Sequence, residues 1–326
     1  MEVRTFGLTG LRISEIGLGC ARIGGIFQTD PGEFVELLCA ALDSGINFFD
    51  TADMYSQGES EELVGRAFRK RRHEVVIASK AGYRLPSQRR LAARLKPLLR
   101  PAIKLLGIKR ERLPAAVRGT LGQDFSPAYL RRAVEGSLRR LRTDWLDLFQ
   151  LHSPPAEVVE RGEWVPALEA LKREGKIRYY GVSCDTVEAA LAALRHPGVS
   201  SLQIAINLLE REAADRILPL ARGKVAVIAR ECLANGLLVK EAGSIDLANY
   251  CRTATDRELR QKQLVALRKL AAENGCTLPQ LALQFVRRLE GVSVTLVGMR
   301  TKKHFADTLR QLDAPALPAA ALASRG

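Results

Sequence analysis

Gly45-Ile-Asn-Phe-Phe-Asp-Thr-Ala-Asp-Met-Tyr55 and Val75-Val-Ile-Ala-Ser-Lys80 each contain an apolar strand that stops at a charged residue. The first strand stops at Asp50, with Tyr55 one short loop beyond, and the second stops at Lys80. A later stretch, Trp145-Leu-Asp-Leu-Phe-Gln-Leu-His152, repeats the pattern and stops at His152. In a parallel barrel the carboxyl ends of the strands converge on one mouth, where catalysis takes place. The pattern therefore predicts an acid, a phenol, an amine and an imidazole at one mouth, and it favours proton-transfer chemistry.

Strands and helices alternate along the rest of the chain. The predicted strands are Glu15–Leu18, Asn47–Asp50, Val75–Lys80, Trp145–His152, Tyr179–Ser183, Ser201–Asn207, Ala226–Arg230 and Ser293–Val297. The predicted helices are Pro31–Ser44, Ser60–Lys70, Pro127–Leu141, Trp164–Glu174, Val187–Leu194, Ala213–Ala221, Arg257–Asn274 with Pro279–Arg288, and Lys302–Gln311. The strands are rich in Val, Ile and Leu, which is typical of strands buried on both faces. Eight strands, each followed by a helix, predict an α/β fold of the (β/α)8 TIM-barrel type.

Three further features complete the expected organisation. Thr5-Phe6 and Leu11-Arg-Ile-Ser14 flank Gly7-Leu-Thr-Gly10 and predict a short N-terminal β-hairpin. A doubly wound sheet, the alternative architecture, would call for a Gly-x-Gly-x-x-Gly turn after its first strand. The chain offers Gly17-Leu-Gly-Cys-Ala-Arg22 there, which lacks the third glycine. We expect one barrel domain over residues 1–326, with a long insertion at 84–118 after the third strand and a flexible, Pro- and Ala-rich tail at 313–326.

Composition excludes several classes of protein. The six cysteines, at positions 20, 39, 184, 232, 251 and 276, form no Cys-x-x-Cys pair and do not group with histidines. We therefore expect neither a metal site nor a disulfide framework. The N-terminal residues lack an apolar run behind a basic region, and no stretch of about 18 apolar residues occurs. The expected location is the cytoplasm.

The insertion at 84–118 carries most of the excess positive charge, which is +14 for the whole chain. Apolar residues recur there at helical spacing, so we expect one or two short helices within 89–107, interrupted at Pro97 and Pro101. Three interpretations remain open: a lid over the barrel mouth, a surface for an anionic lipid or another acidic partner, and a site that steers an anionic substrate. Nucleic-acid binding is disfavoured because no aromatic residues interleave with the cations.

The four polar residues at the strand ends suggest a division of labour. A tyrosine titrates near pH 10 and is a weak acid at neutrality, but a nearby ammonium lowers the pKa of the phenol. Tyr55 would then be the general acid, Lys80 its tuner, Asp50 the anchor of the lysine and His152 the donor that orients the substrate oxygen. Taken singly, each residue has an ordinary structural explanation: Asp50 could cap a turn, Lys80 could be solvated and His152 could be a core histidine.

Several motifs, in order along nearly the whole chain, resemble the aldo-keto reductase family, in particular its bacterial members. They are Gly10–Gly19, Gly45–Asp50 with Thr51–Tyr55, Ser60–Gly65, Val76–Lys80, Leu148–His152, Gly175–Arg178 with Gly181–Ser183, and Val297–Arg300. The resemblance implies a catalytic tetrad of Asp50, Tyr55, Lys80 and His152. It also implies an oxidoreductase that binds NADP(H) without a Rossmann motif and transfers hydride to the carbon of an aldehyde or ketone, while the tyrosine protonates the oxygen.

The resemblance also implies a cofactor site. The residues that it assigns to this site are Gly19, Ser183, Cys184, Gln203, Arg230, Gly298, Arg300, Thr301, His304 and Asp307. Two of them depart from the family: Cys184 stands where an Asn helps to hold the carboxamide, and Arg230 falls near the Tyr that stacks on the nicotinamide. His304 falls where an Arg is frequent in NADPH-preferring members, so NAD(H) is also a candidate cofactor. Cations at the start of a helix suit a phosphate group.

The leading hypothesis is therefore a carbonyl reductase or alcohol dehydrogenase that acts on a small carbonyl or alcohol substrate. The alternatives are a non-catalytic nicotinamide-binding regulatory subunit on the same scaffold and a protein recruited to a membrane or partner through the insertion. We expect a monomer or a small homo-oligomer.

Overall fold

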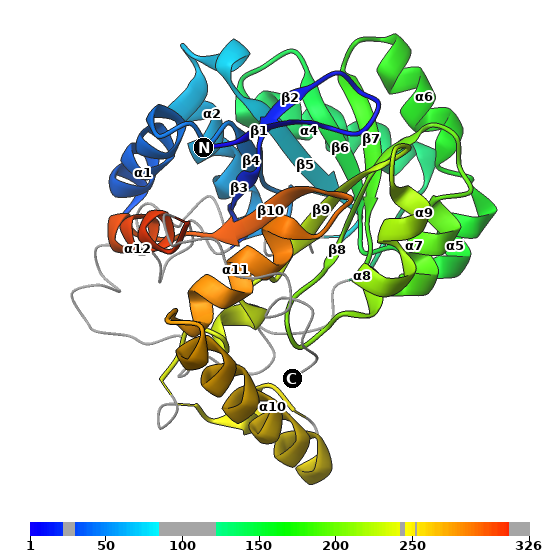
Figure 1. Cartoon of the computed structure of the whole chain (residues 1–326). Coiled ribbons are helices and arrows are strands. Elements are labelled where there is room, and N and C mark those ends of the chain that lie inside the picture. The colour runs from blue at the N-terminus through cyan, green and yellow to red at the C-terminus, as the bar shows by residue number, and fades with distance from the viewer. Residues whose placement is uncertain (22–29, 85–121, 242–244, 252, 313–326) are drawn as a thin grey trace, which may run out of the picture.

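A closed barrel of parallel strands forms the centre of the computed structural model, which describes residues 1–21, 30–84, 122–241, 245–251 and 253–312 (Figure 1). The strands are β3 (Ile16–Gly19), β4 (Phe48–Asp50), β5 (Val76–Ala81), β6 (Leu146–His152), β7 (Ile177–Ser183), β8 (Val199–Ala205), β9 (Ala226–Arg230) and β10 (Val292–Gly298). They follow one another around the barrel in chain order, and β10 closes the ring against β3. The predicted (β/α)8 barrel is confirmed.

Helices surround the barrel. They are α1 (Pro31–Asp43), α2 (Glu59–Phe68), α4 (Pro127–Leu141), α5 (Ala156–Arg161), α6 (Val165–Arg173), α7 (Val187–Ala193), α8 (Glu212–Arg216), α9 (Leu218–Ala221), α10 (Ala254–Glu273), α11 (Leu278–Arg288) and α12 (Lys302–Leu312). Their starts follow local chemistry, as in α1, where the Asp30 side chain accepts backbone bonds before Pro31. Helix α10 extends beyond one end of the barrel (Figure 1).

Two helix predictions needed correction, and one helix was missed. The stretch predicted as one helix over Ala213–Ala221 forms the two short helices α8 and α9, with Pro219 in the first turn of α9. Helix α10 begins at Ala254 rather than at Arg257, because Thr253 and Asp256 form a capping box. Helix α5 was not predicted. No helix in the described part of the chain is long and apolar enough to span a membrane.

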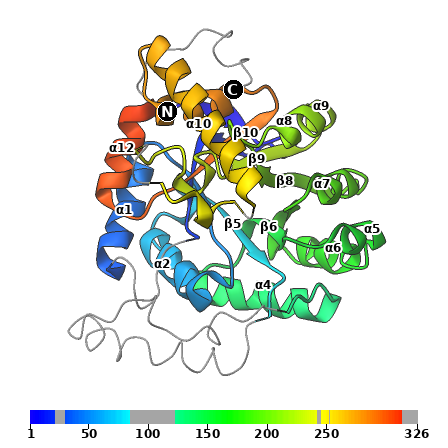
Figure 2. The same cartoon turned by 90° about the horizontal axis from the view of Figure 1, so that it is seen from below.

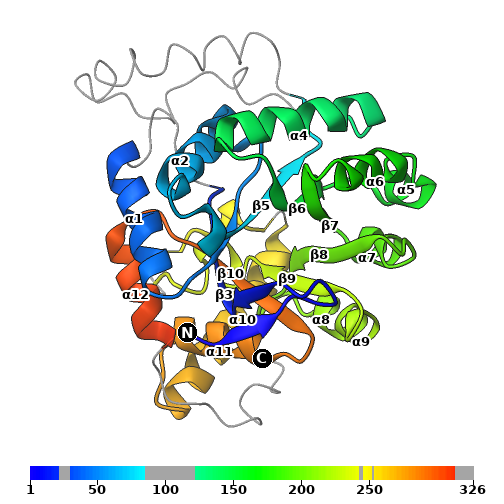
Figure 3. The same cartoon turned by 90° about the horizontal axis from the view of Figure 1, so that it is seen from above.

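The predicted hairpin is also confirmed, and it covers the amino-terminal end of the barrel (Figure 3). Strand β1 (Val3–Thr5) pairs antiparallel with β2 (Arg12–Ser14). The buried Phe6 joins the interior apolar cluster, which includes Phe48, Leu148 and Ile228. The Thr9 carbonyl accepts a hydrogen bond from the Tyr179 hydroxyl. With this end closed, the opposite end is the mouth that can hold a site (Figure 2).

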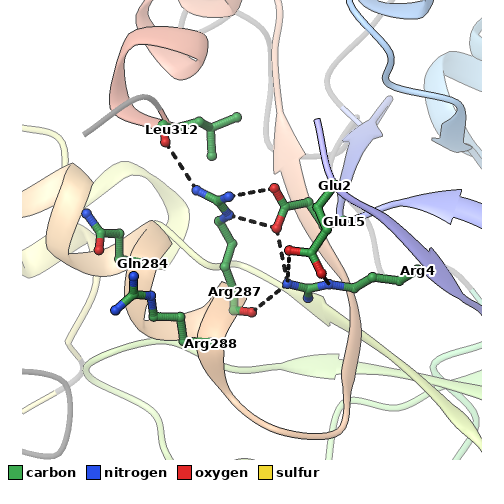
Figure 4. Close-up of a pocket in the computed structure, with 7 residues that line it drawn as sticks. All are labelled: Glu2, Arg4, Glu15, Gln284, Arg287, Arg288 and Leu312. Atoms are coloured by element: carbon green, nitrogen blue, oxygen red, sulfur yellow. Dashed lines mark hydrogen bonds and ion pairs between the residues drawn. The ribbon is translucent and has the colours of Figure 1, made fainter. Parts of the chain in front are cut away.

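A pocket of about 220 Å³ lies beside the hairpin (Figure 4). Glu15, only 3 % exposed, forms ion pairs there with Arg4 at 3.1 Å and with Arg287 at 2.5 Å. The pairs tie the hairpin to helix α11 and to the start of β3. Polar networks at this end of a barrel contribute to stability rather than to catalysis. The predicted helices within 89–107 and the tail at 313–326 lie outside the described residues, as does nearly all of the predicted insertion.

Candidate active site at the barrel mouth

A fully buried ion pair lies at the centre of the mouth. The Lys80 ammonium donates to both oxygens of Asp50, at 2.7 and 2.6 Å, and to the Thr51 carbonyl at 2.9 Å. Asp50 is the last residue of β4 and Lys80 the last but one of β5, and the two strands pair with Asp50 beside Ala78. Burial disfavours the charged amine, but the Asp50 carboxylate and the Tyr55 phenol together outweigh burial, so the pKa of Lys80 is raised. Lys80 is therefore a fixed cation held against Asp50.

Tyr55 lies beside this pair. The Lys80 Nζ atom is 5.1 Å from the centre of the Tyr55 ring. Burial raises the pKa of the Tyr55 phenol above its usual value, while the Lys80 charge opposes the rise. The net direction is opposite to the lowering expected from the sequence, because burial desolvates the phenol and the Asp50 charge offsets part of the effect of the Lys80 charge. A raised pKa keeps Tyr55 protonated at neutral pH, which is the state that a proton donor needs.

The imidazole of His152 completes the group. Its ring centre is 5.6 Å from that of Tyr55 and 5.0 Å from that of Tyr83, and both contacts are edge-to-face. Burial, together with the charges of Lys80 and Arg230, holds the pKa of His152 well below its usual value. A neutral imidazole has one N–H donor and one acceptor nitrogen. Its Nδ1 atom is buried and has no hydrogen-bond partner in the described structure.

Two predicted cofactor residues are hydrogen-bonded to each other and to the ion pair. The Ser183 hydroxyl donates to Gln203 Oε1 at 3.0 Å, and Gln203 Nε2 donates to Asp50 Oδ1 at 2.9 Å. A continuous chain of hydrogen bonds thus runs from Ser183 to Lys80. Cys184, next to Ser183, is fully buried, and its thiol donates to the Val182 carbonyl at 3.6 Å. Its side chain therefore does not replace the amide of an asparagine.

Arg230 lies at the carboxyl end of β9 and is held by groups that the sequence did not suggest. Its guanidinium donates to the Cys184 carbonyl at 3.1 Å and to Asp185 at 2.8 Å, and it also pairs with Glu231. Asn235 in turn donates to Glu231 at 2.8 Å. Two carboxylates therefore offset the guanidinium charge and fix its plane.

Backbone strain gathers at the same mouth. Among the described residues, those with positive φ that are not glycine are Ser56, Gln57, Arg142, Ser153, Glu231, Ala234 and Asn235. All except Arg142, the last-turn cap of α4, lie in loops that follow β4, β6 or β9. Non-glycine residues in this conformation cost about 1 kcal/mol or more each and cluster at functional sites. The strained loops therefore mark this mouth as the candidate active site.

The predicted phosphate loop follows β10. Gly298 leaves open space where a Cβ would lie, and Gly19 stands beside it on β3. Thr301 caps α12 by accepting the His304 backbone N–H at 3.1 Å. The predicted cations are only partly available, because Lys302 pairs with Glu36 of α1 at 2.6 Å. Asp307 pairs with Arg310 within the same helix.

Residues 15–324 match the Aldo/keto reductase family, so the chain belongs to that family. It is 33 % identical to the uncharacterized oxidoreductase YqkF of Bacillus subtilis (strain 168), over 74 % of this chain and 68 % of that protein. The holo form of aldo-keto reductase AKR11C1 from Bacillus halodurans superposes with a TM-score of 0.79 at 28 % identity, covering 100 % of this chain and 97 % of the other.

A third relative bears on the cofactor. An aldo/keto reductase from Klebsiella pneumoniae was solved in complex with NADP and acetate. It superposes with a TM-score of 0.68 at 26 % identity, and the match covers 99 % of this chain and 93 % of the Klebsiella chain. The family, the fold and the assignment as an oxidoreductase are confirmed. The roles of individual residues stay predictions.

Proposed function

We propose that this protein is an NADP(H)-dependent reductase that converts an aldehyde or ketone to an alcohol, or catalyses the reverse reaction. The observation that carries the proposal is the buried Asp50–Lys80 pair with Tyr55 and His152 packed beside it. A non-catalytic subunit would not need to keep a desolvated ion pair next to a phenol, since burying such a pair costs more than an apolar replacement.

The reaction needs a hydride and a proton. NADPH, when bound at this mouth, would be the source of the hydride for the carbonyl carbon. Tyr55 donates its proton to the carbonyl oxygen, and Lys80 stabilises the phenolate that remains. Neutral His152 donates a hydrogen bond that fixes the carbonyl oxygen near Tyr55. Hydride on carbon and proton on oxygen together give the alcohol.

The residues at the mouth fit a nicotinamide cofactor. Ser183 and Gln203 already present polar groups held by the Asp50 network, and they would bind the carboxamide. The Arg230 plane, fixed by Asp185, would cover the ring. The open space at Gly298 and the capped start of α12 suit a phosphate close to the backbone. The proposed site also includes Gly19, which lies beside Gly298, Cys184, which follows Ser183, and Asp307 of α12.

The function can be tested by following NADPH oxidation with a panel of aldehydes and ketones. We expect turnover with at least some of them at rates typical of an enzyme, about 1 per second or more at saturation. Tight NADPH binding without turnover on any carbonyl or alcohol would favour the alternative of a nicotinamide-binding regulatory protein.

NADPH is expected to bind more tightly than NADH, because Arg300, Lys303 and His304 lie at the exposed start of α12. One charge-assisted contact to the 2′-phosphate corresponds to a preference of about tenfold or more. Fluorescence titration with both cofactors measures it. Arg300→Ala should reduce the preference, whereas Arg69→Ala, which removes an exposed arginine at the end of α2, should not. Equal affinities in the unaltered protein would contradict the prediction.

Partners and location remain predictions. They comprise a small carbonyl or alcohol substrate, no nucleic acid, contact with an anionic surface through 84–118, a monomer or small homo-oligomer, and a cytoplasmic location.

A further inference from the structure

A second carboxylate lies in the loop that joins Asp50, the last residue of β4, to Tyr55. Asp53 stands between Asp50 and Tyr55, and its backbone N–H donates to the Lys80 carbonyl at 3.0 Å. The loop is held on both sides, because the Tyr55 N–H donates to the Ala52 carbonyl at 3.1 Å. The position of the Asp53 side chain and that of the Tyr55 ring are therefore set by the same few backbone bonds.

Groups from α2 and α4 face Asp53. Glu61 of α2 is fully buried and accepts from Ser79 at 2.6 Å and from Arg140 of α4 at 2.6 Å. Arg140 also packs on Gly58, where a Cβ would lie 2.6 Å from its side chain. Glu61 and Arg140 form a close ion pair, so the negative charge of Glu61 cancels most of the stabilisation that the Arg140 charge would give to the Asp53 carboxylate.

The Oδ1 atom of Asp53 lacks a hydrogen-bond donor among the described residues. The Tyr129 hydroxyl donates to the Tyr83 carbonyl at 2.9 Å, so its single proton is directed there. The same hydroxyl oxygen is 3.5 Å from Asp53 Oδ2, which is long for a hydrogen bond to a carboxylate. Asp53 Oδ1 is buried without any partner, and so is Gln57 Oε1 in the same loop.

A proton on Asp53 would correct this shortage. A neutral carboxyl has one O–H donor, which could bond the Tyr129 hydroxyl oxygen or another acceptor nearby. Burial, and next the neighbouring Glu61 charge, raise the pKa of Asp53 to about 7, against the smaller opposing influences of Arg140, Met54 and Tyr129. The carboxyl therefore changes charge near neutral pH.

We propose that Asp53 is a positioning residue that holds the Tyr55 loop in its working geometry as a neutral carboxylic acid and loosens it on ionising. The ionised form places a second negative charge beside Glu61 and leaves the buried Oδ1 atom without a donor, which the loop can relieve only by letting water in. Tyr55 lies two residues from Asp53 in the same loop, so a change in the loop also moves Tyr55. Through Tyr129 and the Tyr83 carbonyl, the same change reaches the ring that packs on His152.

The three polar groups packed beside the loop, His152, Tyr55 and Lys80, do not account for a change near pH 7. The pKa of His152 is well below its usual value, and those of Tyr55 and Lys80 are raised. The sign for stability follows from proton binding. The folded state binds the Asp53 proton more tightly than the unfolded chain, so stability falls as pH rises from about 4 to about 7 and then levels off.

The proposal rests on the proposed role of Tyr55, so the test has one readout that needs no catalysis. Melting temperatures of the full chain and of Asp53→Asn are compared at pH 5 and pH 8. Asparagine keeps the shape of the neutral acid and cannot ionise. The quantity compared is the melting temperature of Asp53→Asn minus that of the unaltered chain. We expect this difference to be at least about 2 °C larger at pH 8 than at pH 5. Asp144→Asn, an exposed change before β6, should show no such gain.

The second readout is kcat/KM for a reducible aldehyde from pH 5 to pH 9. If the ionised form is inactive, the unaltered enzyme loses about tenfold between pH 6 and pH 8, and Asp53→Asn loses much less. Identical pH dependence of melting in the two proteins would overturn the proposal. So would a folded Asp53→Asn that is inactive at every pH, because the charged form would then be the working one. If neither the unaltered protein nor Asp53→Asn reduces any aldehyde, but their melting temperatures still differ with pH as expected, the proposed function is rejected and the proposal for Asp53 is not.

Discussion

Replacing Tyr55 with phenylalanine is expected to lower kcat/KM for carbonyl reduction at least about a hundredfold, the scale of a lost general acid. The change removes one oxygen and keeps the ring that contacts His152 and Lys80. The carbonyl oxygen then has no proton donor of suitable geometry, while the binding site for the cofactor is unaltered. Steady-state kinetics with NADPH, together with fluorescence titration of the cofactor, separate the two effects.

Tyr179→Phe is the matched control. It makes the same chemical change at the hairpin end of the barrel, where the hydroxyl bonds the Thr9 carbonyl. We expect it to cost about 1 kcal/mol of stability and to leave kcat/KM within a factor of a few. Near-normal turnover in Tyr55→Phe, with NADPH binding intact, would remove Tyr55 from the role of proton donor.

The sequence could predict the barrel because the signals for it are local. A buried parallel strand is an apolar run, and a strand that ends at Asp50, Lys80 or His152 shows that residue within a few positions. Boundaries shifted where caps and prolines decide them, as at Thr253 and Pro219. The site residues at strand ends could be proposed for the same reason.

The links between those residues could not be predicted, because they join distant parts of the chain. Gln203 donates to Asp50 across 153 positions, and Asp185 holds Arg230 across 45 positions. The pKa of Tyr55 was expected to fall because its neighbour is a lysine. It rises because burial, a property of the folded state, is the larger influence.

Lys80→Met is expected to destabilise the fold by about 3 to 5 kcal/mol, because it breaks a buried ion pair from one side. Lys80 is fully buried and Asp50 is 3 % exposed. In the variant the carboxylate keeps the Gln203 bond at 2.9 Å and loses its cation. Chemical denaturation measures the free energy of unfolding.

Lys80→Met should also lower the rate of carbonyl reduction and change its pH dependence. Lys80 opposes the rise in the pKa of Tyr55, so its removal raises that pKa further. Any residual reduction should therefore persist to higher pH than in the unaltered enzyme, even as the rate at pH 7 falls. An unchanged pH profile with good activity would show that Lys80 does not tune the phenol.

The double variant Asp50→Asn with Lys80→Met separates the two roles of the lysine. It removes both charges and keeps an amide near Gln203, so no uncompensated carboxylate stays buried. Its free energy of unfolding should recover part of the loss seen in Lys80→Met, whereas its activity should not, because the phenolate still lacks a cation. Recovery of both properties would mean that Lys80 acts only by neutralising Asp50. Recovery of neither would mean that the lysine contributes mainly through packing against Tyr55 and the Thr51 carbonyl.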